Sequence, residues 1–559
     1  MVAAFWTLPL LAQGAQRVAI AALNADDLVA QVHWLGKKRM SDEPTAGYVM
    51  RIWQMPASAR LQAQTLDKLA AALTRLGPRA TGPRETNRVH RLFRPVLDDL
   101  VEQESFFDLW EPGGSAPELA LSIRLDPRRA ALWETNLAAV VEELTGARPV
   151  REKGGWQFDL SHGKASAPDP AAARHLRFYH SGVWTMLGLG SSPTEVLNGV
   201  LAQMRREGVS QTPPGTNDWL TADLDLTHLA GALGWPRGLP PHFGRISLAV
   251  NGVRGSVRMH GEVNFQKPLR MELRPWNIPT NLVHEPLIAF TAIRGLREPL
   301  NSSGLWDRGA LGQAPDEVLS WALDTGPLQS HFALPIRKAR EWVNRISEFV
   351  LNKVNPVLVS YGMGKFARAT RGNGLKWAGA PLIAPYLERR ALSGGGFAVG
   401  GLLPFTPTNQ PAPKALYQAV FSRKNLVCYD WELTQPRIAD WLYVGQVFRL
   451  LFEKAQMPAN SAGLTWLLAV APKLGNCVTV VTRSGPSQLS FIRQSSLGFK
   501  AVELHLLADW LESPRFPYGL HTLLAPNLRH LKHPHPRARA KSPPARSIRR
   551  PNDRRTRQP

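Results

Sequence analysis

Several groups of residues in this chain have types and spacings that could carry out chemistry. Ser161, His162, Gly163 and Lys164 have the Ser-x-x-Lys spacing of acyl-transfer enzymes, in which the lysine activates a serine on the first turn of a helix. The glycine, and the Ala- and Pro-rich residues that follow, instead predict a surface loop. The companion motifs of those enzymes are absent from the sequence, so we interpret these residues as a loop without catalytic function.

A second group, Asp223, Asp225 and His228, contains side chains of the types that hold cations. Asp225 comes directly before a helical pattern, at the position where Asp126 and Thr434 stand in two similar stretches of the chain. Short side chains with an oxygen at this position accept hydrogen bonds from the first N–H groups of a helix. The pattern therefore favours helix capping over a metal site.

Two further motifs lack parts that their chemistry needs. Residues 188–192 (GLGSS) join a strand pattern to a helix pattern, as phosphate-binding loops do, but the third glycine and the lysine of such loops are missing. His284 and Glu285 begin like the helix of a metalloprotease, but Pro286 breaks that pattern and no second histidine follows at the required spacing. The first motif predicts a helix cap, and the second predicts no metal site.

The chain has two cysteines, Cys428 and Cys477, which are too few for a disulfide framework or a cysteine zinc site. Both lie in strand-like segments. One disulfide is expected if the chain is exported, and two buried thiols are expected if it is not. The sequence therefore assigns no catalytic, cofactor-binding or metal-binding residue and no cofactor, and it favours a protein that is not an enzyme.

Three similar stretches indicate the elements that must position these residues. Residues 118–146, 218–235 and 425–455 each open with alternating apolar and polar residues, the period of a half-buried strand. Each then passes a leucine and an Asp or Thr into a helical pattern. Pairs of alternating runs follow, and turn residues such as Asn251-Gly252 between them predict β-hairpins.

These patterns predict an α+β fold in which repeated strand-helix-hairpin modules form antiparallel sheets, with helices packed on one face. A chain of 559 residues is long enough for several domains. The predicted divisions are a truncated signal or anchor (1–16), two repeated modules (17–275), an irregular and helical connecting region (276–414), a third module (415–525) and a disordered basic tail (526–559).

The formal net charge of +23 is concentrated at the C-terminus. Residues 529–559 contain eleven Lys or Arg residues and the single acid Asp553, and so carry +10 of that charge. Their prolines and their lack of bulky apolar residues predict disorder, because burial could not offset the entropy of ordering them. We expect weak polyanion binding from this tail, and only weak support for a nucleic-acid partner from the rest of the chain.

The N-terminus resembles an export signal without its charged start. Residues 2–12 are almost wholly apolar and uncharged. A stretch of about 11 residues has the length of a signal-peptide core but not of a membrane span, which needs about 20. We therefore expect an exported, periplasmic or cell-envelope protein with no integral membrane span in its body. If the stretch is not a signal, the expected location is cytoplasmic.

Five phrases carry a family resemblance. They begin at His33, Gln64, Ala131, Phe290 and Glu503 and read HWLGK, QTLDK, ALWETNL, FTAIRG and ELHLLADWL. Over about residues 20–520 the chain resembles an uncharacterised family of exported or envelope-anchored bacterial proteins, of the kind found in Verrucomicrobia-like bacteria. Since the function of that family is unknown, the resemblance implies a location but transfers no activity and no functional residue.

These observations favour a non-enzymatic exported or envelope-associated protein with a binding or scaffolding role, whose ligand the sequence does not identify. Its partner would be an envelope component or a polysaccharide. The alternatives are a hydrolase with an unrecognised active site and a protein that associates with polyanions or nucleic acid through its basic tail. A deep pocket holding a carboxylate or histidine with a strongly shifted pKa would favour the hydrolase.

Overall fold

The computed structural model describes most of the chain between residues 27 and 517. The described residues are 27–75, 83–111, 117–160, 174–191, 199–200, 218–232, 244–302, 312–360, 362, 364–369, 374–379, 383–392, 395–404, 408, 410–448, 461–513 and 516–517. The predicted signal (1–16), the motif at 161–164 and the predicted basic tail (526–559) lie outside them. Within these ranges, no helix is both long enough and apolar enough to cross a membrane.

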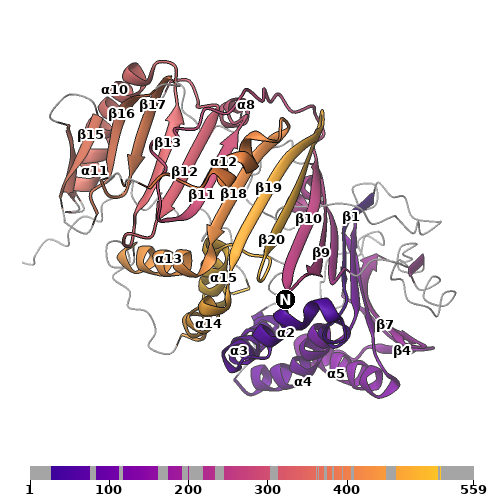
Figure 1. Ribbon diagram of the computed structural model, residues 1–559. Coiled ribbons are helices and arrows are strands. Elements are labelled where there is room, and N and C mark those ends of the chain that lie inside the picture. Colours follow the sequence, from indigo (N-terminus) through magenta and orange to yellow (C-terminus); the bar gives the residue numbers. More distant parts are fainter. Residues whose placement is uncertain are drawn as a thin grey trace, which may run out of the picture. The chain divides into compact units, whose positions relative to one another are not determined.

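The described residues form a mixed α+β fold around one antiparallel sheet of twenty strands (Figure 1). The first ten strands pair in the order β4-β5-β6-β7-β3-β2-β1-β8-β9-β10. Their bounds are β1 Leu28–Trp34, β2 Ser105–Trp110, β3 Glu118–Arg124, β4 Val150–Glu152, β5 Gly155–Asp159, β6 Arg174–Ser181, β7 Trp184–Ser191, β8 Leu220–Asp225, β9 Arg245–Val253 and β10 Ser256–Asn264.

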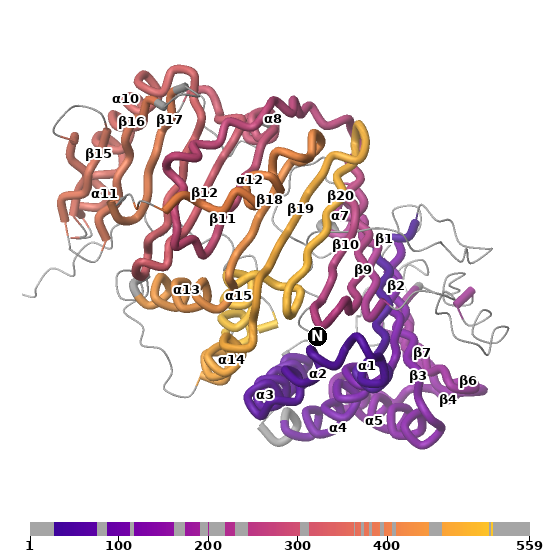
Figure 2. Tube along the Cα trace, in the orientation of Figure 1, coloured from indigo at the N-terminus to yellow at the C-terminus, as the bar shows by residue number. Residues whose placement is uncertain are grey.

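The next ten strands repeat this order as β14-β15-β16-β17-β13-β12-β11-β18-β19-β20. Their bounds are β11 Leu287–Arg294, β12 Glu317–Leu323, β13 Ser330–Pro335, β14 Gly364–Arg368, β15 Gly374–Gly379, β16 Tyr386–Leu392, β17 Gly395–Gly401, β18 Leu426–Leu433, β19 Asn476–Gly485 and β20 Gln488–Ser495. Antiparallel pairing of β10 with β20 joins the two ten-strand halves, and Figure 2 shows these segments side by side.

The α-helices lie mostly between strands of the same half. Their bounds are α1 Lys37–Ser41, α2 Gly47–Trp53, α3 Pro56–Ala72, α4 Pro83–Glu102, α5 Pro127–Thr145, α7 Leu226–Ala232, α8 Arg297–Ser302, α10 Ala339–Phe349, α11 Asn355–Ser360, α12 Lys414–Phe421, α13 Thr434–Phe448, α14 Ala462–Val470 and α15 Ala501–Glu512. The first half has its largest helical insertion between β1 and β2 (α1 to α4), and the second half has its largest between β18 and β19 and after β20 (α13 to α15).

This arrangement differs from the predicted modules. The region 276–414, predicted to be irregular and helical, contributes the strands β11 to β17, and β11 pairs with β18 of the predicted third module. The three strand-then-helix stretches do begin with a strand that leads into a helix: β3 into α5, β8 into α7 and β18 into α13. However, β3 pairs with β7, the last strand before β8, whereas β8 and β18 pair with the strand that follows their helices.

The glycine-rich residues 393–401 show why the middle region was mispredicted. Their composition predicts a loop, but Gly395–Gly401 forms β17, between β13 and β16. A Cβ atom on Gly400 would lie 2.5 Å from the ring of Phe332 on β13. The glycine therefore makes room for an aromatic side chain of the neighbouring strand, which is a packing role that the local sequence does not reveal.

Helices cover both faces of the sheet, whereas the sequence predicted one. Ile123 on β3 packs against α5. From Ile123, a row of directly paired residues crosses β2, β1, β8, β9, β10, β20 and β19 and ends at Asp430 on β18. Asp430 binds Lys500, the residue before α15. Paired residues share a face, so α5 and α15 cover the same face. Thr291 also binds Asp430 on this face, and the adjacent Phe290 therefore points to the other face, where it packs against α12.

Local signals fix where the helices of the α5 and α15 face begin and end. Asp126 accepts a hydrogen bond from the Arg129 N–H at 2.9 Å and caps α5, as the sequence predicts. Gly146 ends α5 in the left-handed conformation, at φ 81°. Ser461 accepts from the Leu464 N–H at 2.9 Å and begins α14. The start and end of α5 and the start of α14 are thus set by local capping residues and do not depend on tertiary contacts.

Candidate functional site

An apolar cavity of about 240 Å³ lies where the helical insertions of the two halves meet. Its walls come from α2, α3 and α4 of the first half and from α14, α15 and the residues just before α15 in the second half. The lining residues are Val49, Ile52, Trp53, Ser58, Leu61, Gln62, Thr65, Leu66, Val101, Trp466, Leu497, Phe499, Leu504, Leu507 and Leu511. The cavity therefore exists only because both insertions are present.

The amphipathic pattern of α3 supplies most of one wall. Met55 precedes α3, and Pro56 at its first position has the fixed φ that suits a helix start. Leu61 and Leu66 are then buried on the side that faces α14 and α15. With Ser58, Gln62 and Thr65 they form the α3 wall of the cavity.

Three polar groups in the wall already have partners. Trp53 Nε1 donates to Gln62 Oε1 at 2.7 Å, and Trp466 Nε1 donates to Ser58 Oγ at 3.1 Å. Ser58 Oγ in turn donates to the Ile52 carbonyl at 2.7 Å. The two indole N–H groups and the hydroxyl of Ser58 are therefore not available to a ligand, and the cavity offers mainly hydrocarbon and aromatic surface.

Polar contacts hold the two walls together at their ends. Lys68 Nζ, on α3, donates to the Leu511 carbonyl of α15 at 2.6 Å. Burial lowers the pKa of Lys68, and the carboxylate of Glu512 opposes this effect. Glu512 also accepts from the Gly463 N–H of α14 at 2.8 Å. The bond from Lys68 thus joins helices of different halves, and Glu512 joins α14 to α15 within the second half.

A buried ionic cluster attaches the start of α15 to the sheet. Asp430 on β18 accepts from Thr291 Oγ1 at 2.6 Å and from Lys500 Nζ at 2.7 Å, and it is 5% exposed. Arg493 on β20 donates to Glu503 on α15 at 2.6 Å. These charges are paired and none of them lines the cavity, so they position its wall and do not face a ligand.

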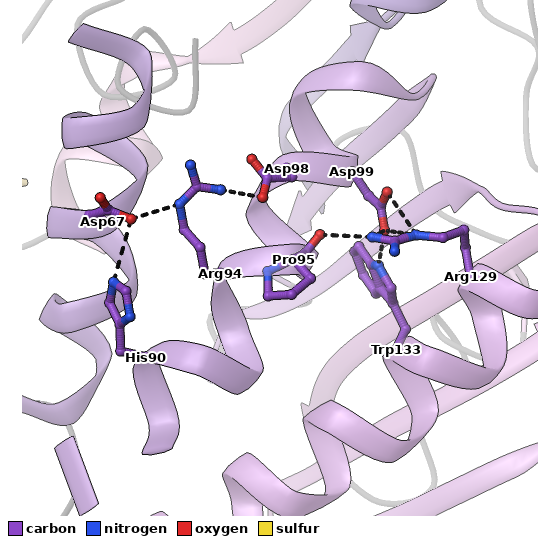
Figure 3. A network of polar contacts seen from close by, with 8 residues as sticks. All are labelled: Asp67, His90, Arg94, Pro95, Asp98, Asp99, Arg129 and Trp133. Atoms are coloured by element: carbon purple, nitrogen blue, oxygen red, sulfur yellow. Dashed lines mark hydrogen bonds and ion pairs between the residues drawn. The ribbon is translucent and has the colours of Figure 1, made fainter. Parts of the chain in front are cut away.

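A second polar network joins α3, α4 and α5 (Figure 3). Asp99 accepts from Arg129 Nη2 at 2.6 Å and from Trp133 Nε1 at 2.8 Å. Asp67 accepts from Arg94 Nε at 2.9 Å. Since the partners of both carboxylates belong to neighbouring helices, this network holds the helix layer together and forms no open site.

The residues that the sequence suggested as cation ligands act locally. Asp225 accepts from the N–H groups of Thr227 at 2.9 Å and His228 at 3.2 Å, which confirms its role as a helix cap. Asp223 forms an ion pair with Arg245. In the part of the chain that the structure describes, no group of three or more His, Cys, Asp or Glu side chains is arranged to hold a metal ion. His284 contacts the Asn281 carbonyl through Nε2 at 2.8 Å.

Cys428 and Cys477 are free thiols. Cys428 pairs with Val481 and Cys477 with Glu432, so the two positions lie four residues apart along the ladder of β18 and β19. At about 3.3 Å per residue this is about 13 Å, well beyond the Cα separation of a disulfide, about 4.4–6.8 Å. Burial raises the pKa of each thiol to about 12. The disulfide expected for an exported chain is not formed, and the cysteines give no support for export.

The sequence did not reveal the cavity. Its lining residues come from separate stretches between residues 49 and 511, and most of them read as ordinary positions on the inner face of a helix. One available signal was the apolar stripe of α3, and another was the phrase ELHLLADWL of α15. The chain matches no protein-family model, no curated protein and no solved structure.

Proposed function

We propose that this chain is a non-enzymatic binding protein of the cell envelope, and that the apolar cavity is its ligand site. The observation that carries the proposal is an open cavity between the two helical insertions, with the polar groups Trp53, Trp466 and Ser58 in its wall already bonded to protein. Ligand sites are typically concave and mainly apolar. Binding an apolar group in such a cavity lowers the free energy, because apolar surface of both partners is removed from water.

The cavity supports binding better than catalysis. Its lining residues include no titratable side chain, and a hydrolase needs a nucleophile or a general base within reach of the substrate. The buried charges beneath α15 pair with one another on the sheet. The envelope location rests on the signal-like residues 2–12 and on the family resemblance.

The architecture fits a scaffolding contribution as well. We infer that a strand-helix-hairpin unit was reused in this chain, because β8-α7-β9-β10 and β18-α13-β19-β20 have the same order of elements and the same pairing. In the first half the helix of this unit is short, whereas in the second half α13 and α14 extend it. The extension supplies part of the cavity wall, so the reuse and the binding site are connected.

Binding can be tested with cis-parinaric acid, an unbranched polyene acid whose fluorescence rises in apolar surroundings. The full chain should bind the probe with one saturable component. The variant Leu507→Trp, which adds volume at a half-buried position of the wall, should weaken binding at least tenfold. The same change at Leu468, which is 58% exposed on α14 and outside the cavity, should leave binding unchanged.

Thermal melts of both variants show whether they are folded, and Leu507→Phe provides a milder second change at the same position. If the probe binds equally to the wild-type chain and to the folded Leu507→Trp and Leu507→Phe variants, the cavity is not the ligand site and the proposed function is wrong.

A further inference from the structure

We infer that the group bound in the cavity is one unbranched acyl chain of about ten carbons. This inference rests on the proposed function and specifies the class of its ligand. Three properties of the cavity support it: its length, its cross-section and the chemistry of its wall.

The lining residues follow two helices over similar lengths. On α3 its wall extends from Ser58 to Leu66, and on α15 from Leu504 to Leu511. At a rise of 1.5 Å per residue these stretches are about 12 Å and about 10 Å long. The bond from Lys68 to the Leu511 carbonyl places the C-terminal ends of both stretches together. From these two matching stretches we infer that the long dimension of the cavity is about 12 Å.

The cross-section suits a single chain. A volume of about 240 Å³ spread over about 12 Å leaves a mean cross-section of about 20 Å². This is the width of one polymethylene chain and is too narrow for a fused ring system lying flat. Since an apolar cavity of about 150 Å³ holds the six carbons of benzene, the present one holds about ten carbons.

The wall suits a saturated chain better than a polar or aromatic ligand. A ligand with several buried hydroxyl or amino groups would need a matching donor or acceptor for each, and the indoles of Trp53 and Trp466 and the hydroxyl of Ser58 are already bonded to protein. An acyl chain makes no such demand, and its polar head group would stay at the cavity mouth in contact with water. One chain width also excludes lipids that must insert two chains together.

The test uses the full chain and competition against cis-parinaric acid by sodium carboxylates of six to sixteen carbons, each below its micelle concentration. Affinity should rise about fourfold for each added methylene and stop rising near ten carbons, where the cavity is full. Decanoyl lysophosphatidylcholine should compete like decanoate, because the two share a chain and differ in head group. Didecanoyl phosphatidylcholine should compete at least tenfold less well.

The outcomes separate this inference from the function it rests on. If naphthalene or adamantane competes better than decanoate, and Leu507→Trp still blocks the probe, the cavity binds ligands but the acyl chain is the wrong class. A competition that does not depend on chain length would also overturn the acyl chain. Loss of decanoate binding in Leu507→Trp and its retention in Leu468→Trp support both the inference and the site.

Discussion

At the scale of single residues, the structure contains carboxyl groups whose burial has a measurable cost. Asp108 on β2 is 7% exposed and accepts a hydrogen bond from Gln31 Nε2 at 2.9 Å. Burial raises the pKa of Asp108 to about 6, and the bond from Gln31 opposes the rise without cancelling it. The folded protein therefore holds a proton on Asp108 more tightly than the unfolded chain does, and the charged form destabilises the fold.

We predict that Asp108→Asn stabilises the protein at high pH. Because the folded pKa lies above the unfolded value, the stability of the wild-type protein rises as the pH falls through about 6 towards 4. Asparagine keeps an acceptor for Gln31 without a charge, and it should raise the free energy of unfolding at pH 8 by on the order of 3 kcal/mol. The gain should fade near pH 4.

Thermal melts of the wild-type and variant proteins between pH 4 and pH 8 measure this effect. The control Asp42→Asn, at an exposed position, should change the melting temperature little at either pH. A lower melting temperature for Asp108→Asn at pH 8 would mean that the charged carboxylate of Asp108 stabilises the folded protein, and it would contradict the prediction.

Among single residues, the helix caps could be predicted from the sequence, whereas the partners of the buried charges could not. The helix caps at Asp126 and Asp225 were predicted correctly, because capping depends only on the next three residues. The partners of Asp430, namely Thr291 and Lys500, are 139 and 70 residues away in the sequence. No local pattern contains that information, so the buried cluster could not be predicted.

At the scale of elements, α15 depends on its ionic attachment. Lys500 precedes α15 and its ammonium group pairs with the buried Asp430. We predict that Lys500→Met lowers the free energy of unfolding by about 3–5 kcal/mol, because it leaves the carboxylate buried without its cation. Since α15 forms one wall of the cavity, this variant should also bind cis-parinaric acid more weakly.

Urea unfolding of Lys500→Met and of the double variant Lys500→Met/Asp430→Asn measures this prediction. Removing both charges should restore more than half of the lost stability. The control Lys338→Met breaks an exposed ion pair with Glu341 and should cost about 1 kcal/mol or less. If the double variant is as unstable as the single one, the loss comes from packing of the lysine side chain and not from the unpaired carboxylate.

Two strands show what the sequence pattern could and could not predict. The strand β8 alternates half-buried and buried residues and was predicted at its correct place. The strand β1 (LVAQVHW) is buried at nearly every position, so it has no period of two, and it was overlooked. The face that α12 covers was unpredictable for a related reason, since an amphipathic helix does not show which side of a sheet it will contact.

At the scale of the whole molecule, the sheets of the two ten-strand halves are joined by the pairing of β10 with β20, beside the contacts between their helices. Phe491 on β20 is 1% exposed and packs in the core of the first half, with Val257, Met259 and Val263 of β10. We predict that Phe491→Ala destabilises both halves together. The expected cost is about 3–5 kcal/mol, because the cavity it leaves lies in a shared core.

Differential scanning calorimetry of the wild-type and Phe491→Ala proteins tests this coupling. A single transition that moves to lower temperature as a whole is the expected result. Two transitions, of which only one moves, would show that the halves unfold independently and that Phe491 belongs to one of them alone.

The identical strand order of the halves was hidden in the sequence because the two sets use different residues for the same pairings. The middle of β11 (AFTAI) and the corresponding part of β1 (AQVHW) lie between equivalent neighbours, but they share few residues. The strongest sequence similarities marked three strand-helix stretches and suggested three modules. Only the pairing of strands far apart in the chain shows two halves.

The seam between β10 and β20 also has a consequence for how the protein is made. The strands β1 to β9 find all their partners before residue 265, so the first half can complete its sheet while the rest is still being synthesised. The outer edge of β10, however, must wait about 220 residues for β20. At about 5–20 residues per second, a nascent chain exposes an unpaired strand for about 10–45 s. Ribosome-bound intermediates of this protein should therefore need protection from edge-to-edge aggregation, although the finished molecule has no such exposed edge at its centre.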